Sequence, residues 1–436
     1  IVVSNHPAFG GSHLPDVTVL APVFANSSDR PVAYLANRAH HAEIGGASPG
    51  SMPASTNCLA EEGVVISPQL LFAGGESKMD DIEKLLHSGN YPSRQVAENL
   101  ADLSAQVASL RLGMDAMEEL LKEYGAEEIS LRMAEMGRES AGSCGEYLKN
   151  WGDCELRAEQ FLDDGDRLSL KIAVADGGAT FDFTGTSSVR KDGLNATEAI
   201  VTSAVCYCLR VLIGKELPLN EGLLATVNIE IPKGSLLSPE FVDDPLHCPG
   251  VAGGNVEISQ RVVDLIFSAF GQVACSQGTM NNLTFGNDQF SHYETIGGGS
   301  GAAIGQDGES AVQVHMTNTA ITDPEVLEAR FPVRLLAFRK RNGSGGAGSW
   351  PGGEGIEREY LFEKTVTISL LTQRRTTGPE GISGGLCGLP GAQFLIRENG
   401  EKIDLKSIDS IEAQSGDRLI LRTPGGGGAG DPELIA

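Results

Sequence analysis

The chain has 436 residues, and 33 Lys and Arg against 58 Asp and Glu give it a formal net charge of −25 at pH 7. This charge argues against nucleic acid and anionic membrane surfaces as partners, because both select for clustered Lys and Arg. Hydrophobic residues make up 41% and charged residues 21%, so the composition is that of a globular protein and not of a disordered chain. The length predicts two or three domains, because a single core stops growing near roughly 250–300 residues.

The sequence carries no evident targeting or membrane-spanning segment. Its apolar runs are all shorter than the roughly 18 residues of a helix that crosses a bilayer. Residues 1–7 lack the basic start and long apolar stretch of a signal peptide, and they read as the end of a strand inside a longer polypeptide. The eight Cys lack the C-x-x-C spacing of a zinc site, so we expect reduced thiols in a cytoplasmic protein.

The first third of the chain predicts a hairpin followed by two long helices. Residues 17–24 and 31–40 are β-type runs joined by a polar turn. Residues 94–124 carry apolar side chains at alternating spacings of four and three, which is the period of a helix. A second helix is predicted over 127–149. The regular stripe predicts that the first helix packs along most of its length against another helix.

The rest of the chain predicts strands and helices that are grouped more than alternated. Strands are expected at 167–175 and 179–184, helices at 197–213 and 257–270, and short strands at 359–362, 365–371, 393–397 and 418–422. The 55 glycines, about 13% where roughly 7% is usual, predict tight turns and close backbone approaches. The fold class is therefore α+β and multidomain. We expect a metal-site hairpin with helices in 1–150, a mixed α/β substrate region in 151–335 and a β-rich, Gly-rich region in 336–436.

The residues that suggest chemistry lie at the open end of the predicted hairpin. A turn centred near 26 to 27 would place His13 opposite His40, with Asp16 three residues from His13. Two imidazoles and one carboxylate suit a catalytic Mn, Fe or Zn ion. The alternative is that these are ordinary surface or core histidines that only make hydrogen bonds.

Other motifs carry weaker signals. Gly425, Gly427 and Gly430 satisfy G-x-G-x-x-G, but no helix can follow so close to the last residue, so a dinucleotide site is not expected. The sequence also contains no G-x-x-x-x-G-K-[ST] motif for ATP. The segments 276–282 and 314–319 are dense in neutral hydrogen-bonding side chains. They could line a pocket for a small polar substrate, or they could simply be turns.

Several ordered motifs along the chain resemble the hydantoinase B/5-oxoprolinase family. They include Ser-Asn-His-Pro at 4–7, His-Leu-Pro-Asp at 13–16, Asn-Arg-Ala-His-His-Ala-Glu at 37–43, Gly-Gly-Asn-Val at 253–256, His-Met-Thr-Asn-Thr at 315–319 and the glycines at 425–428. Within the family, the motifs at 4–7, 280–282 and 383–385 look most like 5-oxoprolinases. The resemblance implies ATP-dependent opening of 5-oxo-L-proline to L-glutamate.

The resemblance also implies a metal and a partner. Related acetone carboxylases hold manganese through a His-x-x-Asp pair and the first His of a His-His pair, which correspond here to His13, Asp16 and His40. The ATP-binding half of the family resides in a hydantoinase A-like subunit or fused domain. We therefore expect this chain to hydrolyse a small lactam that the partner has activated with ATP, within an oligomer.

We also expect a general base and substrate-binding side chains near the metal site. His41 or Glu43 could act as general base, although neighbouring residues of a strand point opposite ways. Polar side chains could hold the substrate, namely Asn281, Asn282, His315 and Asn318. Two alternatives remain open: another enzyme of the family, such as an N-methylhydantoinase or an acetone or acetophenone carboxylase subunit, and a structural subunit without catalysis.

Overall fold

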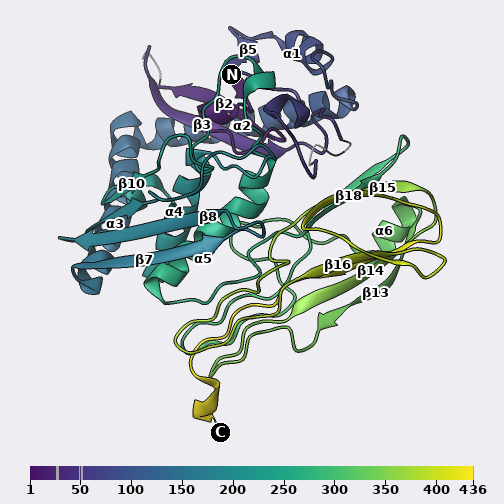
Figure 1. The fold of residues 1–436 in the computed structure, drawn as a ribbon. Helices are drawn as coiled ribbons and strands as arrows, with labels where there is room; N and C mark the ends of the chain where they lie inside the picture. The colour runs from purple at the N-terminus through teal and green to yellow at the C-terminus, as the bar shows by residue number, and fades with distance from the viewer. Residues whose placement is uncertain (26–28, 49, 51–52, 436) are drawn as a thin grey trace.

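The computed structural model describes residues 1–25, 29–48, 50 and 53–435 of the chain (Figure 1). Its described residues form six α-helices and several sheets, so the mixed α and β architecture expected from the sequence is confirmed. The elements are gathered in an N-terminal part, a middle part and a C-terminal part, each with a hydrophobic core of its own.

The N-terminal part is built on a four-stranded antiparallel sheet with the order β3-β2-β1-β4. Its strands are β1 (Val2–Ser4), β2 (Asp16–Phe24), β3 (Pro31–His40) and β4 (Gln69–Leu70), and a small pair, β5 (Phe72–Ala73) and β6 (Glu76–Ser77), follows. The predicted hairpin is confirmed, because β2 and β3 pair antiparallel. Along β2, buried residues alternate with partly exposed ones, as expected of a strand with one face on the core.

The register of this hairpin differs from the predicted one by three residues, since Asp16 and not His13 lies opposite His40. Phe24 pairs with Pro31, so the connection is centred later than expected, and a bulge between Val23 and Phe24 shifts the register further. The centre of the predicted turn, at 26 to 27, lies outside the described residues.

Two helices, α1 (Met79–Leu86) and α2 (Val96–Tyr124), bury residues in the core of this part, whereas α3 (Ala126–Trp151), which follows them, packs on the middle part. Helix α2 packs across β2 and β3, and its buried Leu103, Val107 and Leu110 share one core with Val17 and Val19. The prediction that α2 packs mainly against another helix is therefore wrong. An apolar stripe of helical period is equally suited to a sheet, and only the N-terminal half of this stripe is fully buried.

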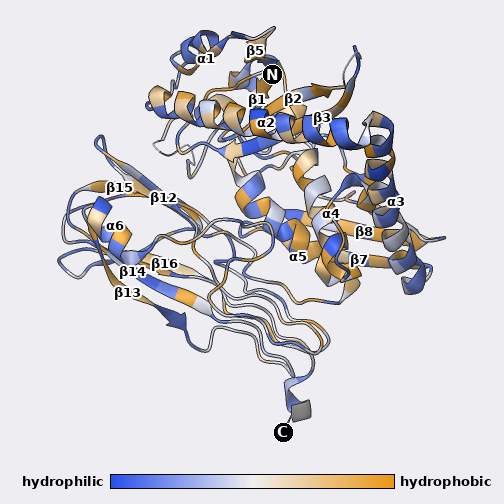
Figure 2. Ribbon diagram, turned by 180° about the vertical axis from the view of Figure 1, so that it is seen from behind, coloured by the Kyte–Doolittle hydropathy of each residue, from blue (hydrophilic) through white to orange (hydrophobic). Residues whose placement is uncertain are grey.

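The middle part is a second sheet covered by helices. Its order is β10-β9-β8-β7, with β7 (Cys154–Phe161), β8 (Arg167–Ala175), β9 (Gly178–Asp182) and β10 (Val227–Glu230), and β9 and β10 run parallel. Helix α5 (Ser259–Phe270) contacts β7 and β8, and α4 (Glu198–Ile213) packs on α5, so both share one core with the sheet. Figure 2 shows that both helices are rich in hydrophobic residues. A π-helical turn, Gly254–Ile258, leads directly into α5.

The C-terminal part contains two sheets that share one core. One has the order β12-β11-β15-β18, formed by β11 (Asn282–Gly286), β12 (Ser291–Glu294), β15 (Val366–Leu371) and β18 (Ile408–Ala413). The other has the order β13-β14-β19-β16-β17, formed by β13 (Val333–Arg341), β14 (Gly355–Phe362), β19 (Arg418–Arg422), β16 (Ala392–Ile396) and β17 (Lys402–Asp404), and α6 (Pro324–Arg330) precedes it. Because β11 pairs with β15, hydrogen bonds cross the boundary expected at residue 335.

Long glycine-rich segments run side by side toward the C-terminus (Figure 1). A Cβ atom on Gly301 would lie 1.8 Å from the carbonyl oxygen of Ala274, and one on Gly426 would lie 1.8 Å from that of Ser300. Only glycine allows backbones to approach so closely. The glycines of the G-x-G-x-x-G match belong to this packing, which explains their number without a dinucleotide.

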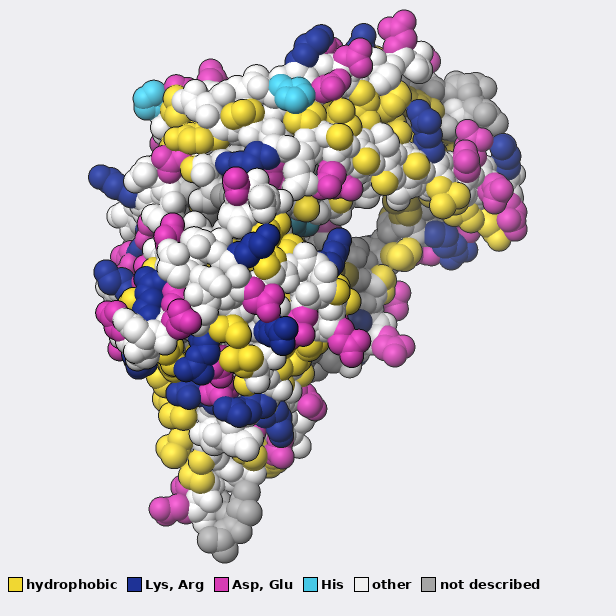
Figure 3. Space-filling model, turned by 90° about the vertical axis from the view of Figure 1, so that its right-hand side faces the viewer, with side chains coloured by type: hydrophobic (Ala, Val, Ile, Leu, Met, Phe, Trp, Pro, Cys, Tyr) yellow, Lys and Arg dark blue, Asp and Glu magenta, His cyan; other side chains and the backbone are white. Residues whose placement is uncertain are grey.

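On the face shown in Figure 3, Lys and Arg side chains are interspersed with Asp and Glu. Among the described residues no helix is both long and apolar enough to span a membrane. All eight cysteines lie within the described part of the chain, and each is a free thiol.

Candidate functional site

The structure brings His13, Asp16 and His40 together, as the sequence predicted. Asp16 begins β2 and His40 ends β3, whereas His13 lies in the turn just before β2. That turn is closed by a hydrogen bond from the Asp16 amide to the His13 carbonyl, 3.1 Å long. The ring centroids of His13 and His40 are 5.2 Å apart, and His13 Nδ1 lies 3.1 Å from Asp16 Oδ2.

The charges of this cluster are set by its surroundings. Burial raises the pKa of Asp16, but His13 and a short hydrogen bond from the Ser12 hydroxyl outweigh it and hold that pKa well below its usual value. His40 remains exposed to solvent, yet the protein atoms crowded around it and the neighbouring His13 lower its pKa to about 4. The His40 imidazole is therefore neutral near pH 7, which is the form that binds metals.

These residues meet some of the requirements of a divalent ion. His13 Nε2 is buried and has no hydrogen-bond partner, while Nδ1 of the same ring faces a carboxylate, an arrangement typical of metal-binding histidines. Within the described residues, however, no group of three or more His, Cys, Asp or Glu side chains is already arranged to hold a metal. Asp16 Oδ2 is instead turned to Ser12 and His13. The donor types fit a divalent ion, and the full ligand set is not preformed.

Of the residues expected as general bases, His41 contacts α2 itself and Glu43 contacts the residues just before it. His41 is fully buried, with Nδ1 2.7 Å from Asn99 Oδ1 and Nε2 3.2 Å from Gln106 Oε1. The carboxylate of Glu43 accepts hydrogen bonds from the Ser93 hydroxyl and from backbone amides at 94 and 95. These contacts anchor α2 against the end of the hairpin, and the catalytic role of either residue stays a prediction.

The four residues expected to bind substrate lie in different surroundings. Asn281 is buried, donates to Gln277 Oε1 and Ile296 O, and accepts from Arg375. His315 Nε2 lies 3.7 Å from Asp264 Oδ1, and Asn318 is exposed.

Asn282 is the member of that set connected to the histidines. It accepts a 2.9 Å hydrogen bond from the Tyr293 hydroxyl, and the Tyr293 ring lies beside the His40 ring. Its expected role in binding substrate remains a prediction.

Three residues near the site were not identified from the sequence. Tyr293 stacks on His40, and burial followed by the charges of Glu257 and Asp16 raises its pKa, which keeps the phenol protonated. Glu257 is fully buried beneath Asn282, and burial raises its pKa to about 8. Glu62 is also buried, and burial raises its pKa to about 7 although two backbone amides and the Thr56 hydroxyl donate to it. A glutamate within the apolar stretch at 256–258 was the available signal for Glu257.

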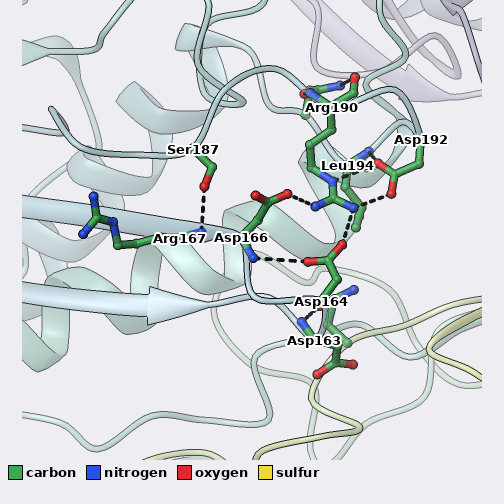
Figure 4. A network of polar contacts seen from close by, with 10 residues as sticks. Asp163, Asp164, Asp166, Arg167, Ser187, Arg190, Asp192 and Leu194 are labelled. Carbon is green, nitrogen blue, oxygen red and sulfur yellow. Dashed lines mark hydrogen bonds and ion pairs between the residues drawn. The ribbon is translucent and has the colours of Figure 1, made fainter.

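A surface pocket of about 750 Å³ lies elsewhere, at the turn between β7 and β8. There Arg190 pairs with Asp164, Asp166 and Asp192 (Figure 4). Burial raises the pKa of Asp164, but the hydrogen bond and charge of Arg190 lower it overall. Because the positive charge of Arg190 offsets the negative charges of the three aspartates, we interpret this network as structural.

The sequence profile of the hydantoinase B/oxoprolinase family matches residues 1–432. The chain belongs to this family. It is 42% identical to 5-oxoprolinase 1 of Arabidopsis thaliana over 457 aligned residues, which take in 99% of this chain and 35% of that protein. The family expected from the sequence motifs is thereby confirmed.

Two solved structures share the fold. The ATP-dependent caprolactamase from Pseudomonas jessenii superposes with a TM-score of 0.88 at 24% identity, covering 99% of this chain and 77% of that chain. A nucleotide-free acetone carboxylase superposes with a TM-score of 0.85 at 18% identity, covering 99% of this chain and 65% of that one. The chain spans about a third of the length of the plant 5-oxoprolinase that it matches.

Proposed function

We propose that the chain is the hydrolytic part of an ATP-dependent enzyme that opens cyclic amides, with 5-oxo-L-proline as substrate and L-glutamate as product. The observation that carries the proposal is the meeting of His13, Asp16 and His40 at one end of a hairpin, in a chain of this family. The 42% identity to a 5-oxoprolinase over nearly the whole chain supports the choice of substrate.

A lactam carbonyl is a poor electrophile, so hydrolysis needs prior activation. We propose that a hydantoinase A-like subunit or domain phosphorylates the amide oxygen with ATP, and that water then attacks the activated ring on this chain. The share of the plant 5-oxoprolinase that lies outside this match leaves room for such a half. The name of the structurally similar caprolactamase joins the same two elements, ATP dependence and a lactam.

A divalent ion, Mn, Zn or Fe, is proposed to bind His13, Asp16 and His40. Bound there, it would lower the pKa of a water molecule and so supply the nucleophile. Two observations support this proposal. The low pKa of His40 keeps its imidazole neutral, and Asp16 faces Nδ1 of His13 while Nε2 stays free.

A substrate panel tests the proposal against its alternatives. The chain is combined with its hydantoinase A-like partner and ATP and is offered 5-oxo-L-proline, N-methylhydantoin, or acetone with bicarbonate. We expect glutamate from 5-oxo-L-proline, and negligible turnover by the chain alone. Turnover of acetone only when bicarbonate is present would identify a carboxylase instead. A chain that binds no metal and contributes nothing to turnover would be a structural subunit.

A further inference from the structure

Tyr293 is the aromatic neighbour of His40 and comes from a different part of the molecule. Their ring centroids are 6.2 Å apart and the ring planes differ by 6°. His40 ends β3 of the N-terminal sheet, whereas Tyr293 lies on β12 of the C-terminal part. The Tyr293 hydroxyl donates a 2.9 Å hydrogen bond to Asn282 Oδ1. The Tyr293 ring is therefore held both by its stacking on His40 and by the hydrogen bond of its hydroxyl group.

The Asn282 amide is itself fixed by two contacts. Its nitrogen donates to Glu257 Oε1 at 2.8 Å and to the Leu371 carbonyl at 2.7 Å, so its oxygen must face Tyr293. Glu257 also accepts from the Met280 amide and is fully buried. A Tyr–Asn–Glu path thus runs from His40 into the core.

Glu257 lies in the π-helical turn that precedes α5. Such turns are rare in proteins, and those that occur are frequently found at functional sites. Here the turn belongs to the middle part of the fold, so the path joins all three parts of the molecule. Buried polar groups are costly unless they are paired, and this path pairs each amide and hydroxyl group in turn.

We propose that Tyr293, held by Asn282 and Glu257, is a positioning residue that fixes the plane of the His40 imidazole. The catalytic consequence rests on the proposed function, because it assumes that His40 serves the hydrolysis. Tyr293 acts through His40, because the plane of the His40 ring sets the direction in which its nitrogens point. Outer-shell partners of this kind typically contribute about 10–100-fold to affinity or activity.

The chain offers a matched control on the opposite face of β12. Glu294 follows Tyr293 on that strand, and it accepts a hydrogen bond of 2.5 Å from the hydroxyl of fully buried Tyr360. Tyr293→Phe and Tyr360→Phe thus delete the same group on the two sides of one strand. Both variants retain their aromatic rings.

Two readouts separate positioning from stability. The first is the His40 resonance in metal-free protein labelled with [13Cε1]histidine, assigned with His40→Asn. The second is kcat and KM for 5-oxo-L-proline with the partner and ATP. We expect Tyr293→Phe to move the His40 resonance and to lower kcat about 10-fold with little change in KM. Tyr360→Phe should lower stability and leave both readouts near those of the parent.

Glu257 supplies a second test in case Tyr293→Phe folds poorly. Glu257→Gln keeps an acceptor for Asn282 and should resemble the parent in both readouts, while Glu257→Leu should resemble Tyr293→Phe. An unmoved His40 resonance with parental kcat in Tyr293→Phe would overturn the proposal, and so would an equal loss of kcat in Tyr360→Phe. If the parent opens no cyclic amide, the proposed function fails, and the resonance still decides whether Tyr293 positions His40.

Discussion

Replacing Glu257 by Gln should change how the stability of the chain depends on pH. Glu257 is fully buried, and burial raises its pKa from 4.5 to about 8. In the unfolded chain this carboxyl ionises above about pH 4.5, while in the folded chain it keeps its proton up to about pH 8. The unfolded state is therefore favoured progressively as the pH rises through this window. The Gln side chain has no proton to lose and removes that contribution.

The size of the effect follows from the pKa difference. Within the window each pH unit changes the free energy of unfolding by at most about 1.4 kcal/mol. Between pH 5 and pH 7 the parent should therefore lose about 2–3 kcal/mol that Glu257→Gln keeps. Buried Glu62, whose pKa is raised to about 7, titrates in the same range but is present in both proteins and cancels in the difference.

Urea unfolding of the parent and Glu257→Gln at pH 5, 6 and 7 measures this difference. Glu240→Gln, at an exposed position, is the control and should follow the parent. Unfolding free energies of the parent and Glu257→Gln that change in parallel with pH would refute the reasoning. Glu257 would then be ionised in the folded chain, with a counter-charge strong enough to offset its burial.

Three further predictions concern stability and are checked by urea unfolding. Leu103→Asp should destabilise the chain by several kcal/mol, because it places an unpaired carboxylate between α2 and the N-terminal sheet; a midpoint equal to the parent's would contradict the packing. Glu62→Gln should cost about 1–3 kcal/mol, since its amide NH₂ would face one of the two backbone N–H donors, and an unchanged curve would show that this N–H finds another acceptor. Arg190→Ala should cost about 1 kcal/mol and less at high salt, because the three partly exposed aspartates then repel one another; an effect independent of salt would exclude this cause.

Local patterns were sufficient to predict much of the secondary structure. The helix predicted at 94–124 is α2 (Val96–Tyr124), and strands β8 and β19 have the predicted bounds. Helical periodicity and turn residues act within a few positions of the chain, so they can be read without knowing the fold. The partner of α2 could not be read in this way, because an apolar stripe does not specify what covers it.

The candidate site was predictable in its residue types but not in its geometry. His13 and His40 meet although the predicted hairpin register was wrong, because the turn from His13 to Asp16 places the first histidine beside the end of β3. Tyr293 and Glu257 are each more than 200 positions from His40, and nothing local connects them to it. Their approach depends on how the three parts of the fold pack together, which local sequence patterns do not encode.

The rate of glutamate formation from 5-oxo-L-proline and ATP tests the central claim most directly. It is measured with the hydantoinase A-like partner, for the parent chain and for His40→Ala at equal folded concentration. We predict that the parent forms glutamate and that His40→Ala is slower by at least about 100-fold, because the ion proposed to activate the water would lose a ligand. Glutamate formation by His40→Ala at the parental rate would contradict the account.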